Sequence, residues 1–269
     1  MASLMHMDQN TLAAKPGQRD PITRLIRLFD PMPLTFLHPL DDSGVSTARG
    51  CIGGERAFAF CTDMRVMGGA LGAGGCRYIA ETIDMAAKEG SPVIGVWHSG
   101  GARLADGVES LDGVGRIFAA MTCASGRIPQ ISVLVGPAAG GAAYGPALTD
   151  LVTMSSVGRV FVTGPDVVRA VTGEQIDMEG LGGPDAHSRR SGVTHVVAPS
   201  DEEALEKARH LTILLTRQAK FGSRTVDGEP DLRALRTTRC AGAAASIRSA
   251  PRRQRASSAC AIRSGFLCW

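Results

Sequence analysis

Apolar positions along the chain predict short strands that alternate with helices. The predicted strands cover residues 50–52, 57–61, 92–97, 130–135, part of 146–154, 159–163 and 192–198. The predicted helices cover residues 21–29, 76–88, 104–123, 166–172 and 200–218. Because the strands are apolar on both faces and alternate with helices, the pattern indicates an α/β core with a largely parallel sheet.

Two of these helices have the clearest apolar spacing. In 104–123, residues recurring every three or four positions predict one buried face, made of Leu104, Val108, Leu111, Gly115, Phe118 and Met121. In the last helix, Ser200 and Glu203 have the spacing of a capping box. The apolar stripe that follows the cap comprises Ala204, Leu205, Ala208, Leu211, Leu214 and Leu215.

Paired glycines follow two of the predicted strands. Gly100 and Gly101 come after 92–97, and Gly140 and Gly141 come after 130–135. The first backbone N–H groups of a following helix lack intrahelical acceptors, so they can stabilise a carbonyl oxygen that gains negative charge. The alternative is that each glycine pair only permits close packing of helix on strand. A third pair, Gly53 and Gly54, joins two strands in a predicted hairpin.

Charge divides the chain into two parts. Residues 236–269 hold seven Arg and no Lys, Asp or Glu, so the first 235 residues carry 22 basic and 26 acidic side chains. Nothing in that mildly acidic body suggests nucleic acid or an anionic membrane as a partner.

Cysteine spacing and hydropathy indicate a cytoplasmic protein. The seven cysteines are widely spaced and form no CxxC pair, which is the pattern of a reduced environment. The start, MASLMHMDQN, lacks the pattern of a signal peptide, and four Gly and two Pro interrupt the most apolar stretch, 131–148. We therefore expect neither export nor a membrane span.

The histidines do not suggest a nucleophile or a metal site. His98 and Ser99 are adjacent, and adjacent strand residues point to opposite faces, which argues against a direct relay between them. His187 and His195 are expected to be structural, and no spacing of ligands supports a metal centre.

Charged residues after the first glycine pair can be interpreted as surface or ion-pair residues, or as ligand-binding residues. Asp106, Glu109 and Asp112 are three residues apart and share one helix face, which a solvated surface explains. Arg103 could meet a phosphate or a carboxylate of a ligand, or form an ion pair with a nearby acid.

Long stretches of the sequence resemble the carboxyltransferase (beta) subunits of biotin-dependent acyl-CoA carboxylases of the acetyl- and propionyl-CoA carboxylase type. The resemblance covers about residues 20–225 and includes FCTDMRVMGGALG (60–72), SGGARLADGVESL (99–111), ASGRIPQISVLVGPAAGGAAYGPALTDLVTM (124–154), VFVTGPDVVRAVTGE (160–174) and LGGPDAHSRRSGVTH (181–195). It implies an α/β fold of the crotonase-like (ClpP/crotonase) type, built from repeated ββα units.

The resemblance also implies the reaction and its partners. Such subunits move a carboxyl group from N1 of biotin, held on a carrier protein, to the α-carbon of an acyl-CoA, through an enolate that backbone N–H groups stabilise. The implied partners are an acyl-CoA substrate, a biotin carboxylase and biotin carboxyl carrier (alpha) subunit, and further copies in a homo-oligomer. No metal is expected in this chain.

Site residues follow from the matched motifs. The resemblance implies catalytic backbone at Gly100, Gly101, Ala102, Gly140 and Gly141. It implies substrate-binding or positioning roles at Gly68, Gly69, Arg103 and Tyr144.

Composition and the resemblance together predict three parts of the chain. Residues 1–20 form a loose N-terminal arm, 21–235 the N-terminal carboxyltransferase domain, and 236–269 an Arg-, Ala- and Ser-rich tail with the composition of an out-of-frame translation. We interpret the chain as truncated, although a genuine basic tail that binds an acidic partner is the alternative.

Two other functions stay open. One is a catalytically silent fragment that binds CoA or affects the assembly of complete subunits. The other is a crotonase-like hydratase or isomerase, for which Asp106 or Glu109 would be the carboxylate base.

Overall fold

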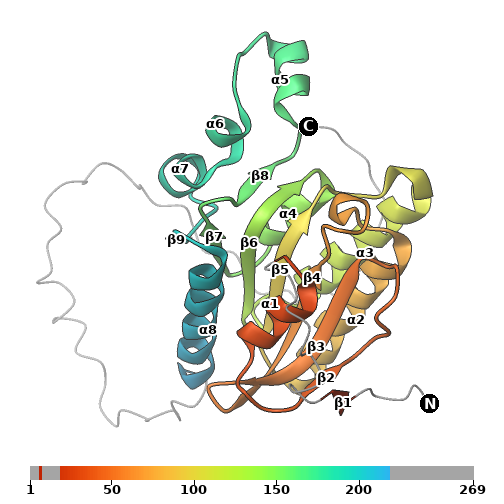
Figure 1. Ribbon diagram of the computed structural model, residues 1–269, viewed down its shortest axis with the longest axis vertical. Helices are drawn as coiled ribbons and strands as arrows, with labels where there is room; N and C mark the ends of the chain where they lie inside the picture. Colours follow the sequence, from red (N-terminus) through yellow and green to blue (C-terminus); the bar gives the residue numbers. More distant parts are fainter. Residues whose placement is uncertain (1–5, 8–18, 219–269) are drawn as a thin grey trace, which may run out of the picture. The chain divides into compact units, whose positions relative to one another are not determined.

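The computed structural model describes residues 6–7 and 19–218 (Figure 1). Its helices are α1 (Pro21–Leu28), α2 (Ala73–Glu89), α3 (Val108–Ala124), α4 (Gly141–Ala147), α5 (Pro165–Thr172), α6 (Met178–Gly182), α7 (Pro184–Ala186) and α8 (Asp201–Gln218). Its strands are β1 (His6–Met7), β2 (Leu34–Phe36), β3 (Val45–Ile52), β4 (Glu55–Thr62), β5 (Val93–Ser99), β6 (Gln130–Ala139), β7 (Leu151–Ser155), β8 (Arg159–Phe161) and β9 (Val196–Ala198). The predicted α/β class is confirmed.

One mixed sheet of nine strands organises the described residues. The strand order is β1-β2-β3-β4-β5-β6-β7-β9, and β8 pairs with the end of β6. Strands β1 to β4 are antiparallel, whereas all pairs from β4 to β9 are parallel. The expectation of a largely parallel sheet therefore fits only the second half. The predicted hairpin joins β3 to β4 across Gly53 and Gly54, whose positive φ angles of 63° and 83° suit a tight turn.

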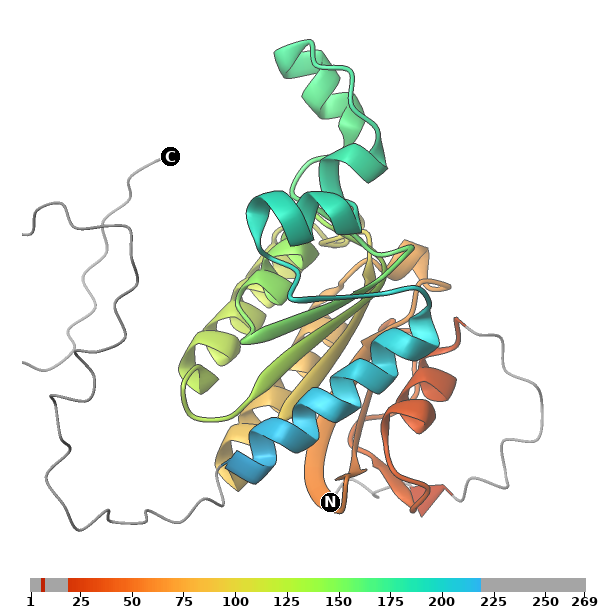
Figure 2. The same ribbon diagram turned by 90° about the vertical axis from the view of Figure 1, so that its left-hand side faces the viewer.

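Helices cover both faces of the sheet. Helices α2, α3 and α4 pack on one face around buried residues that include Phe60, Trp97, Ile117 and Leu134. Helices α1 and α8 pack on the other face around Leu25, Ile94, Val133 and Leu205. Figure 2 looks onto the face that α8 crosses. Two apolar layers therefore enclose the parallel strands, as a sheet that is apolar on both faces requires.

Helix α3 differs from its sequence prediction. The chain forms a short 3₁₀ turn at Leu104–Asp106, and Gly107 (φ 59°, ψ −134°) separates this turn from the helix. The exposed fractions of Leu104, Val108 and Leu111 are 85%, 79% and 58%, and Gly115 is also exposed, so the predicted buried face is wrong at its first four positions. The face that is buried instead comprises Ser110, Gly113, Val114, Ile117, Ala120, Met121 and Ala124. A Cβ on Gly113 would lie 2.8 Å from the Cβ of Cys76, so this small residue turns toward α2.

Between β8 and β9 the chain makes a helical excursion, most of which was not predicted from the sequence. Of the region between β8 and β9, only α5 was expected, and α6, α7 and a π-helical turn (His187–Ser191) follow it. Figure 1 shows this excursion beyond the end of β6. The predicted strand 192–198 shortens to β9.

The structure describes part of the predicted N-terminal arm and none of the predicted tail. Within the predicted loose arm, β1 pairs with β2 at the edge of the sheet. The expected tail, 236–269, lies outside the described residues.

At the start of α8, the Glu203 amide donates to the Ser200 hydroxyl at 3.2 Å, which confirms this half of the predicted capping box. No helix in the described part of the chain is long and apolar enough to cross a membrane.

Asp30 joins α1, the hairpin and α8. Its carboxylate accepts from the amides of Gly53 (3.1 Å) and Gly54 (2.9 Å), and from the Arg209 guanidinium at 2.7 Å. Burial raises the pKa of Asp30, but the hydrogen bonds from Gly54, Arg209 and Gly53 outweigh burial, so the pKa lies below its ordinary value of 3.8. The ionised carboxylate therefore stabilises the fold.

We expect Asp30→Ala to lower the free energy of unfolding by about 3 kcal/mol, because it removes three charge-assisted bonds and leaves Arg209 without its carboxylate. Urea unfolding of the full chain at pH 7 measures the loss. The exposed Asp42 provides the control, since Asp42→Ala should change stability by less than about 0.5 kcal/mol.

The same bond has a defined pH dependence. Because the folded pKa of Asp30 is depressed, its contribution is complete above pH 3.8 and is lost as the pH falls through the folded pKa. The wild-type and Asp30→Ala stabilities should therefore converge in acid. Equal unfolding midpoints for the Asp30 and Asp42 variants at pH 7 would contradict this role.

Candidate active site

Three glycine-containing loops meet at the carboxyl ends of β4, β5 and β6. These strands are parallel neighbours, so the loops that follow them emerge at one edge of the sheet. The loops contain the 3₁₀ turn Met67–Gly69, the turn through Gly100 and Gly101, and the start of α4 at Gly141. Ligands of α/β sheets bind at such an edge.

The first two loops are fastened to each other by backbone hydrogen bonds. The Gly100 amide donates to the carbonyl of Gly68 at 3.0 Å, and the Leu71 amide donates to that of Gly101 at 2.7 Å. The buried Ser99 hydroxyl donates to the Gly69 carbonyl at 2.6 Å. Gly68 and Gly69 therefore hold the next glycine turn in place.

The second and third loops touch through backbone alone. Gly101 has a φ of 99°, and a Cβ there would lie 2.7 Å from the carbonyl oxygen of Ala139 and 3.6 Å from the Cα of Gly140. Gly140 also has a positive φ, 55°. Because an L side chain fits neither the angle nor the space, close packing explains why glycine stands at position 101.

Backbone amides beside this contact differ in whether they are free. Gly101 donates to the Ser99 hydroxyl at 3.2 Å, and Gly140 donates to the Phe161 carbonyl at 3.2 Å. The amides of Ala102 and Gly141, each one residue further on, have no acceptor among the described residues. The half-buried residues Ala102 and Gly141 therefore offer two unpaired donors, one from each loop.

The structure thus separates the predicted catalytic backbone into two groups. The amides of Gly100, Gly101 and Gly140 donate to acceptors inside the protein, and these glycines shape the loops. Ala102 and Gly141 keep unpaired donors. The prediction treated all five alike because paired glycines in a sequence do not reveal which N–H groups the other loops satisfy.

Arg103 and Tyr144 lie around the loops in different ways. The Arg103 guanidinium reaches the carbonyls of Ser43 (3.5 Å) and Ala70 (3.4 Å), and it lies 3.9 Å from the Asp106 carboxylate. It therefore links the loop after β4 to the segment ahead of β3. Tyr144 is about half exposed on α4, where its ring contacts that of Phe118 edge-on at a centroid distance of 5.8 Å.

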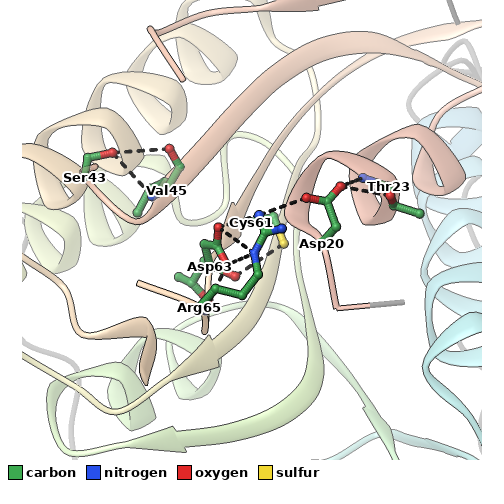
Figure 3. Close-up of polar contacts among 8 residues, drawn as sticks. Asp20, Thr23, Ser43, Val45, Cys61, Asp63 and Arg65 are labelled. Carbon is green, nitrogen blue, oxygen red and sulfur yellow. Dashed lines mark hydrogen bonds and ion pairs between the residues drawn. The ribbon is translucent and has the colours of Figure 1, made fainter. Parts of the chain in front are cut away.

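An ionic cluster fixes the other end of the loop after β4 (Figure 3). The Arg65 guanidinium pairs with Asp63 at 2.7 Å and with Asp20, the N-cap of α1, at 2.9 Å. The bond to Asp63 is the main cause that raises the pKa of Arg65. Burial raises the pKa of Asp63, but the bonds from Arg65 outweigh burial and bring the pKa below its ordinary value. Both groups therefore stay charged.

Sequence reasoning missed the residues that seat α4 on the sheet. A Cβ on Gly145 would lie 2.6 Å from the ring of Trp97, which is buried and donates to the Ser132 hydroxyl at 3.0 Å. This close approach sets the distance from α4 to the sheet. The sequence signal was the Gly-Pro pair at positions 145 and 146, but the indole that fills the space comes from a distant strand.

His187 and His195 form hydrogen bonds within the fold, as a structural role requires. His187 bonds Ser191 and the Val160 carbonyl, each at 2.7 Å, and His195 accepts from the Val152 amide at 3.1 Å. Burial, with the charges of Arg24 and Arg19, lowers the pKa of His98 to about 4, so His98 is neutral at pH 7. The described residues contain no group of three or more His, Cys, Asp or Glu that could hold a metal.

The two carboxylates considered as bases are placed unfavourably for that role. Asp106 lies beside Arg103, and Glu109 is exposed in the first turn of α3. Neither is part of the hydrogen-bonded contact between the loops.

Comparisons with known proteins identify the family of the chain. Residues 12–240 match the family model of the carboxyl transferase domain. The propionyl-CoA carboxylase beta chain of Rhodococcus erythropolis is 57% identical over 218 residues, which is 81% of this chain and 46% of that protein. The chain thus spans about half the length of the curated relatives that it matches.

Solved structures share the fold. The transcarboxylase 12S hexamer with hydrolysed methylmalonyl-coenzyme A bound has a TM-score of 0.69 and 37% identity, over 71% of this chain and 40% of that one. A chain of the Pseudomonas malonate decarboxylase MdcD-MdcE hetero-dimer has a TM-score of 0.62 and 25% identity, over 73% of this chain and 86% of that one. The fold is therefore crotonase-like, and the chain belongs to the carboxyl transferase domain family.

Proposed function

We propose that this chain supplies the acyl-CoA half of a carboxyltransferase site. The Ala102 and Gly141 amides bind the thioester oxygen while it becomes an enolate oxygen. The observation that carries the proposal is that these two amides lack acceptors where two glycine loops touch. Donors already in place need no reorganisation when the charge develops.

The reaction joins two substrates. Carboxybiotin on a carrier protein supplies the carboxyl group. Its N1–carboxyl bond and the Cα–H bond of the acyl-CoA break, a C–C bond forms between the α-carbon and the carboxyl carbon, and N1 of biotin receives the proton. The chain's own role is to orient the thioester and stabilise its oxygen. The described residues offer one set of loop donors, so we place the donors for the biotin ureido group on a second domain.

The partners follow from the same proposal. An alpha subunit carrying biotin carboxylase and biotin carrier functions would deliver the carboxyl group, and several copies of the chain would share one assembly. Similarity to a propionyl-CoA carboxylase beta chain supports propionyl-CoA as the first substrate to test. We place the protein in the reduced cytoplasm, because Cys51, Cys61, Cys76 and Cys123 are free thiols.

The hydratase alternative has a direct test. Hydration of crotonyl-CoA needs a carboxylate base beside the thioester, and neither Asp106 nor Glu109 belongs to the loop contact. We expect no hydration above the uncatalysed rate when the full chain is mixed with crotonyl-CoA. Measured hydration that disappears in Glu109→Gln would replace the proposed reaction with this one.

Removing the Gly141 donor tests the proposed oxyanion site. Gly141→Pro deletes the N–H at a first helical position that accepts proline, whereas Gly141→Ala adds a Cβ at 3.0 Å from Val114 but keeps the N–H. We expect Gly141→Pro to reduce kcat for carboxyl transfer about 100- to 1000-fold below that of Gly141→Ala. The assay uses propionyl-CoA, carboxylated carrier and the assembled enzyme.

A binding measurement makes this test independent of assembly. A nitronate analogue of propionyl-CoA carries the negative oxygen of an enolate, so calorimetry should show that Gly141→Pro weakens its binding more than that of propionyl-CoA itself. Equal affinities of Gly141→Pro and Gly141→Ala for the analogue would remove Gly141 from the site.

Neighbouring glycines should respond differently to the same substitution. A Cβ on Gly101 meets the Ala139 carbonyl at 2.7 Å with φ at 99°, whereas a Cβ on Gly100 lies at 3.4 Å from its nearest neighbour, the Gly68 carbonyl, with no positive φ. We expect Gly101→Ala to lower the free energy of unfolding by about 2 kcal/mol and Gly100→Ala by less than about 1 kcal/mol. Thermal unfolding compares them, and equal effects would show that the loops are not in backbone contact.

A further inference from the structure

Ser99 is the last residue of β5, and its side chain is fully buried between two of the glycine-containing loops. Its hydroxyl donates to the Gly69 carbonyl at 2.6 Å and accepts from the Gly101 amide at 3.2 Å. One hydroxyl therefore ties the loop after β4 to the glycine turn after β5. Because its proton is held by a backbone carbonyl, the hydroxyl suits a link between the loops better than a nucleophile.

The ladder between β5 and β6 is interrupted just ahead of this turn. Trp97 pairs with Leu134 and Ser99 with Ala138, so β5 advances two residues (97 to 99) while β6 advances four (134 to 138). Such an irregularity interrupts the regular backbone hydrogen bonds of the ladder, and it is common next to active sites. The Ser99 hydroxyl therefore fastens the turn at a point where the ladder is irregular.

Two successive peptide groups set the direction of the Ala102 amide. The first joins Gly100 to Gly101, and the Ser99 hydroxyl holds its N–H. The second joins Gly101 to Ala102, and the Leu71 amide donates to its carbonyl at 2.7 Å. In a planar trans peptide the C=O and the N–H point in opposite directions. The Ala102 N–H therefore points away from Leu71, and it has no acceptor among the described residues.

The chain turns between these two peptide groups at Gly101, with a φ of 99°. Glycine has no Cβ that restricts rotation, so hydrogen bonds on either side must hold this angle. Without the Ser99 hydroxyl, the Gly101 amide and the Gly69 carbonyl would each lose a partner. Because an unpaired backbone group inside a protein is costly, the turn would rotate to restore a bond. The same rotation would redirect the Ala102 N–H.

We propose that Ser99 is a positioning residue for carboxyl transfer, and that its hydroxyl directs the Ala102 N–H toward the thioester oxygen. The inference rests on the proposed function, in which that N–H is one of the two oxyanion donors. Ser99 acts through the backbone and does not touch the substrate. A donor stabilises developing charge only from a fixed position, and a displacement of about 1 Å can cost about 100-fold in rate. The effect is therefore larger on the enolate than on the bound thioester, whose oxygen carries less charge.

A purely structural role is the alternative, and a neighbouring residue already fills it. The Thr62 hydroxyl, also fully buried, accepts from the His98 amide at 2.7 Å and donates to the His98 carbonyl at 3.1 Å. This link joins β4 to β5 one residue before Ser99. The strands are thus fastened independently of Ser99, so we expect the fold to survive removal of the Ser99 hydroxyl.

Calorimetry of the full chain with two ligands tests the role of Ser99. Ser99→Ala removes the hydroxyl and adds no volume. We expect it to weaken binding of the nitronate analogue by about tenfold or more, while the affinity for propionyl-CoA changes by less than about threefold. In the assembled enzyme, kcat should fall by about 10- to 100-fold with KM close to its wild-type value.

Thr212→Val is the matched control. It removes another buried hydroxyl, which donates to the Ala208 carbonyl at 2.8 Å within α8. This variant should lower the thermal unfolding midpoint and leave both affinities unchanged. If Ser99→Ala does not fold, Ser99→Cys is the second variant. Its thiol is a weaker donor and acceptor, so it should show a smaller loss that is still selective for the nitronate analogue.

Three results would overturn the positioning role. They are an equal loss of affinity for both ligands in the Ser99 variant, unchanged affinities for both, and a selective loss for the nitronate analogue in Thr212→Val as well.

The Gly141 variants separate this inference from the proposed function. Suppose that Gly141→Pro binds the nitronate analogue more weakly than Gly141→Ala, but Ser99→Ala binds it as tightly as the wild type. The oxyanion site is then retained and the positioning role is rejected. If the two Gly141 variants bind alike and Ser99→Ala still loses the analogue selectively, Gly141 is removed from the site and the role of Ser99 is retained. Equal binding by all of these variants would reject both.

Discussion

The site depends on a backbone contact that leaves no room for a side chain. Gly101 approaches Ala139 and Gly140 so closely that a Cβ would lie 2.7 Å from a carbonyl oxygen. This contact brings the carboxyl ends of β5 and β6 together, and the hydrogen bond from Gly100 to Gly68 adds the loop after β4. Three loops that are far apart in the sequence are thus fixed at one edge of the sheet.

The two explanations for paired glycines apply to different residues. Close packing accounts for Gly101, and the amides of Gly100, Gly101 and Gly140 are satisfied inside the protein. The donors available to a ligand come one position later, at Ala102 and Gly141. Glycine therefore serves the site mainly by placing the backbone of the next residue. That next residue needs only its N–H, so an alanine can stand there.

Local chemistry made part of the fold predictable. The Gly53 and Gly54 hairpin and the Ser200 cap each depend on residues close in sequence, and the structure contains both. The outer side of α3 was not predictable in this way. Apolar spacing indicates that a helix has an apolar face, but Val108 and Val114 belong to two such faces, and only packing decides which one meets the sheet.

The two glycine loops could be found from the sequence, but the pairing of their amides could not. Motif resemblance identified both glycine loops, whereas the partners of Gly100 and Gly140 come from Gly68 and Phe161, which are distant in sequence. The same holds for the ion pair between Arg65 and Asp20 and for the Trp97 ring that receives Gly145. Contacts of this range depend on the assembled sheet, so no local pattern encodes them.

A crystal structure of the full chain with propionyl-CoA tests the central claim most directly. The account predicts the thioester oxygen about 2.7–3.1 Å from the amide nitrogens of Ala102 and Gly141, at the edge where β5 and β6 end. A thioester bound elsewhere, or either amide donating to another group of the protein in the complex, would contradict it.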